Sequence, residues 1–254
     1  MALPKTPSFR LDGRRAVVTG AGRGIGLADA AALADAGAGV TLVARSTGEI
    51  EEAVAQIVDA GGRAIAAPRD VSDIAAVQAF FAIRPAFHVL VNNAGTNRPK
   101  SMTEVTEDDF RAVLELNVKS AYFVAQAAAL KMIEEKVEGS LIHMGSQMGH
   151  VGGVDRSLYC ASKWAMEGMN KAFALDLAQY QIRSNTIAPT FIETPLTRPF
   201  FENAEFKASV LRRIKLGRVG QVTDLMGSVR FLASDASALM TGSSLVVDGG
   251  WTAD

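Results

Sequence analysis

Short apolar runs rich in β-branched residues alternate along this chain with longer stretches of helical periodicity. The apolar runs are Ala16–Thr19, Val40–Ala44, Ala64–Ala67, Val89–Asn92, Ser140–Met144, Asn185–Ile187 and Leu245–Val247. Segments near 25–36, 48–60, 73–82, 107–135, 157–180 and 222–234 have helix-forming composition and the length of crossover connections. Such strand–helix–strand repetition implies a parallel sheet with helices on both faces. The sequence therefore predicts a doubly wound α/β fold of about seven strands.

One region breaks this alternation. No linker, low-complexity tract or block of like charge divides the 254 residues, and 48% AVILMFWYC with 21% DEKR gives an ordinary ratio of core to surface. We therefore expect a single domain over residues 1–254, and disorder, collagen and coiled coil are excluded. The irregular segment 189–203 carries three prolines. Long structured loops in compact domains are usually lids or binding loops, so we expect a lid at about 190–215.

Charge and cysteine content limit the classes of partner. Lys and Arg number 26 and Asp and Glu 27, so the net charge of −1 offers no basic excess for binding nucleic acid. No apolar run approaches the roughly 18–20 residues that span a bilayer, and the opening MALPKTPSFRLDGRR lacks the apolar stretch of a secretory signal. Cys160 is the single cysteine, and the three histidines include no i, i+4 pair. We expect a cytoplasmic protein without membrane contact, disulfide or catalytic metal.

A glycine-rich turn follows the first predicted strand. It reads Gly20-Ala21-Gly22-Arg23-Gly24-Ile25-Gly26 and opens a helical segment. Glycine allows positive φ and lets a phosphate approach the main chain, while the helix N-terminus presents unpaired N–H groups. The spacing G-x-x-x-G-x-G differs from the G-x-G-x-x-G fingerprint. The order of strand, turn and helix favours a Rossmann-like dinucleotide site over a turn needed only for packing.

The end of the second predicted strand bears on the choice of nucleotide. A carboxylate about 20 residues beyond the glycines would accept the ribose 2′-hydroxyl, whereas an arginine would accommodate a 2′-phosphate. This strand ends in Arg45 and Ser46 with no acid, and Arg23 in the turn adds a second guanidinium. NADP(H) is favoured, and NAD remains an alternative cofactor. Arg45 alone could also be a solvated charge at a strand end.

Two further residues suit acid–base chemistry. Tyr159 and Lys163 are four positions apart in a helical segment and therefore share a face. A neighbouring ammonium stabilises a phenolate and lowers a tyrosine pKa from its usual value near 10. This spacing is common by chance, so its position after a parallel strand and opposite a nucleotide turn is what makes it informative.

Several motifs together resemble the short-chain dehydrogenase/reductase family. They are Thr19–Gly26, Asn92-Asn93-Ala94-Gly95, Asn117, Ser146, Tyr159-x-x-x-Lys163 and the closing Val247-Asp248-Gly249-Gly250. The resemblance covers nearly the whole chain. It implies that Tyr159 is the general acid/base, that Lys163 holds the nicotinamide ribose and lowers the tyrosine pKa, that Ser146 binds the substrate oxygen, and that Asn117 positions a water for proton relay.

The resemblance also implies a set of cofactor contacts. Besides Arg23, Arg45, Ser46, Tyr159 and Lys163, the expected cofactor-binding residues are Gly20, Gly24, Ile25, Gly26, Asp70, Val71, Asn93, Ala94, Gly95, Pro189, Ile192 and Thr194. Asp70 and Val71 would contact adenine, and Thr194 matches the position that binds the carboxamide. Thr190 stands where the family usually has glycine, which narrows the pocket or adds a hydroxyl contact near the nicotinamide.

Substrate choice is expected to depend on the loops 96–100 and 147–156 and on the lid. These loops are polar or cationic as much as apolar, which suits a hydroxylated substrate, anionic ones included, better than a steroid. The expected substrate-binding residues are Ser146, Gln147, Arg156, Tyr159 and Thr190; alternatively, the loop charges face water at the rim. The resemblance indicates a polyol, sugar or sugar-acid dehydrogenase, or a 3-oxoacyl thioester reductase.

Other readings of the motifs remain open. An extended-branch epimerase also uses Tyr-x-x-x-Lys but needs a further substrate domain, for which 254 residues leave little room. A non-catalytic NAD(P)-binding regulator would keep the glycine turn and lose the chemical residues. The long helical segments 107–135 and 157–180 pair subunits in the family, so a homotetramer with two-fold interfaces is expected.

Overall fold

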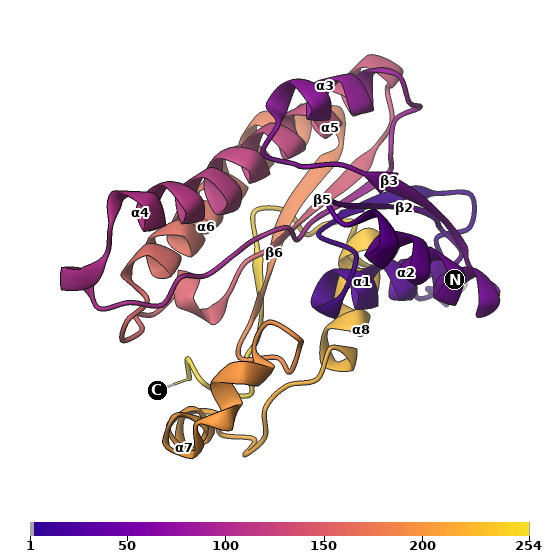
Figure 1. Cartoon of the computed structure of the whole chain (residues 1–254). Coiled ribbons are helices and arrows are strands. Elements are labelled where there is room, and N and C mark those ends of the chain that lie inside the picture. Colours follow the sequence, from indigo (N-terminus) through magenta and orange to yellow (C-terminus); the bar gives the residue numbers. More distant parts are fainter. Residues whose placement is uncertain (1–2, 254) are drawn as a thin grey trace.

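Seven parallel strands form the central sheet of the structure, a computed structural model that describes residues 3–253 (Figure 1). They are β1 (Arg15–Thr19), β2 (Gly39–Ala44), β3 (Arg63–Pro68), β4 (Val89–Asn92), β5 (Gly139–Met144), β6 (Ile182–Pro189) and β7 (Ser244–Val247). All seven predicted strands are confirmed; the sixth is the most extended relative to its prediction, because its backbone pairs with both β5 and β7.

The described part of the chain contains eight α-helices, of which α7 lies away from the sheet (Figure 1). They are α1 (Gly24–Asp35), α2 (Thr47–Asp59), α3 (Ile74–Ala82), α4 (Glu107–Leu114), α5 (Ala121–Glu135), α6 (Ser157–Leu177), α7 (Ala204–Arg213) and α8 (Thr223–Ala233). The predicted helical segment 107–135 is interrupted, since a π-helix at Glu115–Ser120 separates α4 from α5. A short 3-10 helix, Arg198–Glu202, precedes α7 in the irregular segment.

Apolar side chains cover both faces of the sheet. On one face, residues of α1, α2 and α8 such as Leu33, Ile57 and Leu232 pack against strand residues. On the other face, α3 and α5 contribute Phe80 and Met132. Because the central strands are covered on both faces, β4 and β5 are buried along their whole length, as expected for a parallel sheet, whereas the edge strands β3 and β7 are partly exposed. The doubly wound α/β class is confirmed.

The order of the strands determines where a ligand can bind. It runs β3-β2-β1-β4-β5-β6-β7, so the chain leaves β1 toward one edge and returns to build the other half from β4. In open α/β sheets, ligands bind outside the carboxyl ends of the strands at this switch point. The glycine turn after β1 and the segment after β4 both lie there.

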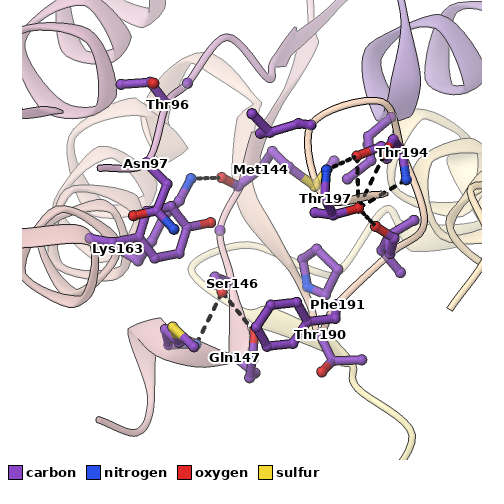
Figure 2. Close-up of a pocket in the computed structure, with 18 of the residues that line it drawn as sticks. Thr96, Asn97, Met144, Ser146, Gln147, Lys163, Thr190, Phe191, Thr194 and Thr197 are labelled. Carbon is purple, nitrogen blue, oxygen red and sulfur yellow. Dashed lines mark hydrogen bonds between the residues drawn. The ribbon is translucent and has the colours of Figure 1, made fainter. Parts of the chain in front are cut away.

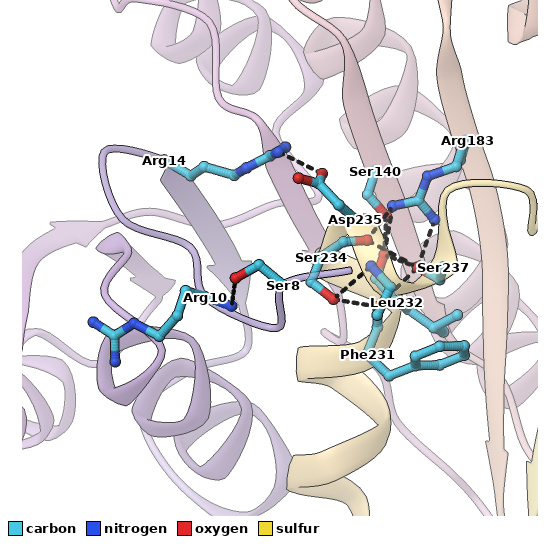
Figure 3. Close-up of polar contacts among 11 residues, drawn as sticks. Ser8, Arg10, Arg14, Ser140, Arg183, Phe231, Leu232, Ser234, Asp235 and Ser237 are labelled. Atoms are coloured by element: carbon cyan, nitrogen blue, oxygen red, sulfur yellow. Dashed lines mark hydrogen bonds and ion pairs between the residues drawn. The ribbon is translucent and has the colours of Figure 1, made fainter. Parts of the chain in front are cut away.

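Buried polar contacts join β6 to the C-terminal end of α8, at the opposite end of these strands (Figure 3). The Arg183 guanidinium donates to the Leu232 carbonyl oxygen at 2.8 Å and to Ser237 Oγ at 3.0 Å. Ser140 Oγ donates to the same carbonyl at 2.8 Å. Burial lowers the pKa of Arg183, but an arginine remains charged. The cluster satisfies carbonyl groups that the end of α8 leaves unpaired.

Candidate active site

The turn between β1 and α1 has the geometry of a phosphate-binding loop. Gly20 and Gly24 have φ of +65° and +59°, a region that favours glycine. A Cβ on Gly26 would overlap the Gly20 carbonyl oxygen. Asn93 holds the turn, because its Nδ2 donates to the Thr19 carbonyl at 3.0 Å and the Gly20 carbonyl at 3.2 Å. The open backbone at the start of α1 can therefore receive a pyrophosphate.

A groove runs from this turn across the carboxyl ends of β2, β3 and β4. Its lining includes twelve of the expected cofactor residues: Gly20, Arg23, Gly24, Ile25, Arg45, Ser46, Asp70, Val71, Asn93, Ala94, Gly95 and Thr194. Gly26 packs against the Gly20 carbonyl within the turn. Pro189 and Ile192 line the adjoining pocket. The two hollows share residues such as Ile25 and Gly95. Together they can hold an elongated dinucleotide.

The Asp70 carboxylate can accept a hydrogen bond from a ligand in this groove. Burial alone would raise its pKa, but the N–H and hydroxyl of Ser72 and the charge of Arg45 bring the pKa below its usual value. The Ser72 groups donate to Oδ1 at 2.9 and 2.7 Å. The carboxylate is therefore ionised at neutral pH and suits an amino donor such as that of adenine.

The far end of the groove contains two charges that the sequence reasoning missed. Glu49 accepts from Arg23 at 3.1 Å, and Arg69 has a buried Nε without a hydrogen-bond partner among residues 3–253. Glu49 could have been foreseen, since Ser46 and Glu49 have capping-box spacing and the Glu49 N–H donates to Ser46 Oγ at 3.4 Å. Arg45 is exposed at the end of β2. Of the two arginines that the sequence assigned to a 2′-phosphate, Arg23 is paired with the carboxylate of Glu49.

Ser146, Tyr159 and Lys163 line the second pocket. Figure 2 shows Ser146 and Lys163 there. Ser146 follows β5 and donates to Gln147 Oε1 at 2.7 Å, while Tyr159 and Lys163 occupy the first turns of α6. Lys163 Nζ donates to the Met144 carbonyl at 2.7 Å and lies 5.4 Å from the centroid of the Tyr159 ring. The structure thus brings three of the four expected catalytic residues to one pocket.

The ionisable groups of this pocket are shifted by burial. Burial raises the pKa of Tyr159, while a hydrogen bond with Ser146 and the charge of Arg156 oppose that rise. Burial lowers the pKa of Lys163 to about 8, and the charge of Glu167 acts in the opposite direction. Lys163 is not among the groups that shift the Tyr159 pKa here, so its effect on the tyrosine remains a prediction.

Asn117, the fourth expected catalytic residue, lies in the π-helix between α4 and α5. Its Nδ2 donates to the Thr96 carbonyl at 2.9 Å and to Ser162 Oγ at 3.1 Å, and its Oδ1 accepts from the Thr96 N–H at 2.8 Å. The side chain is buried and joins the segment after β4 to α6. Asn117 therefore fixes the walls between which Tyr159 lies.

The wall of this pocket contains unsatisfied polar atoms. Gln147, Arg156 and Thr190 line the pocket together with Ser146 and Tyr159, so the residues expected to bind substrate lie around one cavity. Thr190 Oγ1 and Asn97 Oδ1 are buried and have no hydrogen-bond partner within residues 3–253. Buried polar groups are nearly always hydrogen-bonded, so these two atoms are exceptions in the pocket wall.

Residues 3–253 contain neither a metal-binding cluster nor a membrane-spanning helix. No three His, Cys, Asp or Glu side chains of residues 3–253 are grouped so that they could hold a metal ion. In the same stretch no helix has the length and apolar character needed to cross a membrane.

Comparison with known proteins gives matches along the whole chain. A family model described as enoyl-(acyl carrier protein) reductase matches residues 20–252. The chain is 35% identical over 245 residues to the D-erythrulose reductase of Gallus gallus, and the alignment covers 96% of this chain and 98% of the relative. It is 36% identical over 253 residues to the 2-dehydro-3-deoxy-D-gluconate 5-dehydrogenase of Escherichia coli (strain K12), with 97% and 98% covered.

A solved structure gives the same result. The gluconate 5-dehydrogenase of Burkholderia cenocepacia J2315 in complex with NADP and tartrate matches with a TM-score of 0.92 and 38% identity, covering 97% of this chain and 98% of that one. The chain belongs to the short-chain dehydrogenase/reductase family. It is an NAD(P)-dependent oxidoreductase that interconverts alcohol and carbonyl groups.

Proposed function

We propose that this enzyme is an NADP(H)-dependent dehydrogenase/reductase of a small polyhydroxylated substrate: a polyol, a sugar or a sugar acid. The observation that carries the proposal is the polar lining of the pocket of Ser146 and Tyr159, to which Asn97, Gln147, Arg156 and Thr190 belong. Substrate hydroxyls would hydrogen-bond with side chains of this lining, whereas an apolar substrate would cover them and leave them unpaired at a cost of about 1–3 kcal/mol each. The sugar and sugar-acid enzymes among the relatives support the same class.

Four residues divide the chemistry in this proposal. The nicotinamide cofactor supplies or accepts the hydride. Tyr159 gives a proton to the carbonyl oxygen or takes one from the alcohol, and Ser146 hydrogen-bonds that oxygen. Lys163 holds the nicotinamide ribose, and Asn117 positions a water that connects the site to solvent.

The groove favours NADP(H) over NAD(H) as the cofactor. Arg45 and Ser46 end β2 without an acid that would bind a 2′-hydroxyl, and Arg45 is exposed at that end. The NADP in the related gluconate 5-dehydrogenase supports this choice. NAD remains the alternative, since the Arg45 guanidinium could stack on adenine.

The remaining parts of the proposal concern the whole enzyme. Residues 1–254 form one catalytic domain, in which the segment at about 190–215 is the substrate lid. Rings of that segment, Phe191, Phe201 and Phe206, contact one another, and Phe191 contacts Trp251. We place the enzyme in the cytoplasm as a homotetramer, without nucleic-acid or membrane partners.

A substrate screen tests the proposed function. The purified enzyme is assayed at 340 nm with polyols, sugars and sugar acids against both cofactors, and with acetoacetyl-coenzyme A as a 3-oxoacyl thioester. We expect turnover of a polyhydroxylated substrate with NADP(H). Faster turnover of the thioester would favour the 3-oxoacyl reductase alternative. In that case the acyl chain would contact the apolar lid side chains Leu196 and Phe200, which line the pocket.

A further inference from the structure

Arg156 is a buried cation at the start of α6. Arg156 is only 7% exposed and immediately precedes Ser157, the first residue of the helix. Its Nη1 donates to the Asp155 carbonyl oxygen at 3.2 Å, and across residues 3–253 no acid forms an ion pair with it. Although burial lowers its pKa, an arginine stays charged. A buried charge without a partner is costly, so a function for it is expected.

The guanidinium lies on the wall of the substrate pocket. Arg156 lines that pocket with Ser146, Gln147 and Thr190. The ring of Phe200, from the lid, lies over the guanidinium at 5.7 Å from the ring centroid. A ring contact of this kind uses the plane of the guanidinium and leaves the N–H donors at its edge available. The lid therefore covers Arg156 without satisfying its donors.

The other cations around the pocket are already engaged. Arg98 donates to both Asp108 and Asp109. Arg198 in the lid is exposed and lies 3.7 Å from Glu193. Lys163 donates to the Met144 carbonyl and has its proposed role at the ribose. Within the described chain, Arg156 is thus the buried cation of this pocket that lacks both a carboxylate and a catalytic role.

We propose that Arg156 binds a carboxylate of the substrate, so that the enzyme is selective for sugar acids over the corresponding neutral polyols. The inference rests on the proposed function and narrows its substrate class. A carboxylate matches the paired N–H groups of one guanidinium and carries the single charge that one unpaired cation can neutralise. A phosphate dianion would call for a second free cation. The charges of Arg156 and Tyr159 act on one another, so the anionic group would bind at the same end of the pocket as the reacting oxygen.

The neighbouring charges agree with this role. Asp155 is exposed and forms no ion pair with Arg156 within residues 3–253, while its charge acts on the guanidinium in the direction that raises the Arg156 pKa. Asn97, Gln147 and Thr190 line the same pocket and offer polar groups to the hydroxyls of the substrate. A hydroxylated carboxylate therefore satisfies the cation and the polar lining at once, whereas a neutral polyol leaves the cation unpaired.

Matched ligands test the proposal. D-erythronate, D-xylonate and D-gluconate are each compared with the alditol of the same chain, namely erythritol, xylitol and D-glucitol. Calorimetry on the NADPH-loaded enzyme measures binding without turnover, and NADP⁺ reduction measures kcat/KM. We expect at least one acid to exceed its alditol tenfold or more in both. In Arg156→Gln that ratio should fall at least tenfold, mainly through KM, and Arg156→Lys should restore part of it.

Controls separate this role from a structural one. Arg198→Gln removes an exposed lid arginine and should keep the acid-to-alditol ratio, and NADPH binding by each variant checks that it is folded. Equal binding of acids and alditols by the wild type, or an equal loss for both in Arg156→Gln, would overturn the proposal. If alditols react and acids are not preferred, the proposed function stands and this inference fails. If an acid binds through Arg156 but no member of the panel reacts, the proposed function fails instead.

Discussion

Arg45 and Arg23 differ in their availability to a 2′-phosphate. Glu49 pairs with Arg23, while Arg45 is exposed and forms no ion pair within residues 3–253. An exposed ion pair such as Arg23–Glu49 contributes about 0–1 kcal/mol, so a bound phosphate can draw Arg23 away. The carboxylate of Glu49 nevertheless opposes a dianion at this end of the groove. Cofactor preference is therefore a balance between these three side chains.

Exchange of Arg45 tests this balance. A guanidinium–phosphate contact contributes about 1.5–3 kcal/mol, so the wild type should prefer NADP(H) tenfold or more in kcat/KM. Arg45→Asp should lower that preference below parity, because it adds a carboxylate for the 2′-hydroxyl. Glu49→Gln is the matched control and should increase the NADP(H) preference. Equal or better kcat/KM with NAD in the wild type would contradict the assignment.

Tyr159→Phe tests the proton donor. The change removes the hydroxyl and little packing, so turnover should fall at least a hundredfold while NADPH affinity changes little. Steady-state kinetics and a fluorescence titration of NADPH measure the two quantities. A variant that keeps more than a tenth of the wild-type kcat would refute the acid/base role.

Lys163 should make cofactor binding depend on pH. Burial lowers its pKa to about 8, so the ammonium that would hold the ribose is lost as the pH rises through that value. NADP⁺ affinity should therefore weaken above about pH 8 in titrations from pH 6 to 10. The Glu167 carboxylate raises the Lys163 pKa, so Glu167→Gln should move the break to lower pH. An unshifted break would exclude this coupling.

Side-chain identities in the site were predictable, but their pairings were not. The family resemblance singled out Ser146, Tyr159 and Lys163, because their motifs occur together and in order along the chain. The Arg23–Glu49 pair and the unpartnered Thr190 hydroxyl arise from side chains of different elements. Their distances depend on packing that no local pattern encodes.

Helix α1 contains an acid in its buried face. Asp29 is fully buried, and neither carboxylate oxygen has a hydrogen-bond partner in the described chain. Burial raises its pKa well above 3.8. Gly26 and Leu33 are buried on the same helix. Composition predicted the helix but not the free-energy cost of burying the Asp29 carboxyl group.

Asp29 should therefore lower stability as the pH rises. Its folded pKa is raised, so the unfolded chain loses the proton first and stability falls from about pH 3.8 upward until the folded pKa is reached. The limiting slope is about 1.4 kcal/mol per pH unit. Asp29→Asn, which cannot ionise, should raise the melting temperature at pH 8 and have little effect near pH 4. A rise in melting temperature of the same size at pH 4 and pH 8 would show that the charge of Asp29 is not the cause.

The π-helix at 115–120 shows a further limit of sequence reasoning at this scale. Apolar periodicity predicted a continuous helical segment over 107–135, and the structure does continue from α4 through the π turn into α5. Periodicity does not register one widened turn. That turn carries Asn117, whose hydrogen bonds to Thr96 and Ser162 compensate for the poorer helical geometry.

At the scale of the whole molecule, α5 and α6 present apolar side chains to solvent. Leu130 on α5 and Trp164 and Leu175 on α6 are more than half exposed. Trp164 and Leu175 are eleven residues apart, about three helical turns, and thus share one face. The ring of Tyr122 on α5 contacts Phe173 on α6 at 5.2 Å, so the two helices lie side by side. Contiguous exposed apolar patches of this kind mark association surfaces.

Association through this patch should supply one of the two-fold interfaces of the proposed homotetramer. Trp164→Asp combined with Leu175→Asp places charge in a two-fold interface, where each substitution meets its own copy or a neighbour of it. Light scattering at micromolar concentration should give a wild-type mass four times that of the chain and a smaller species for the double variant. Ile83→Asp, at an exposed apolar position after α3, is the control and should leave the mass unchanged. A monomeric wild type would refute the tetramer, and an unchanged double variant would place its interfaces elsewhere on the molecule.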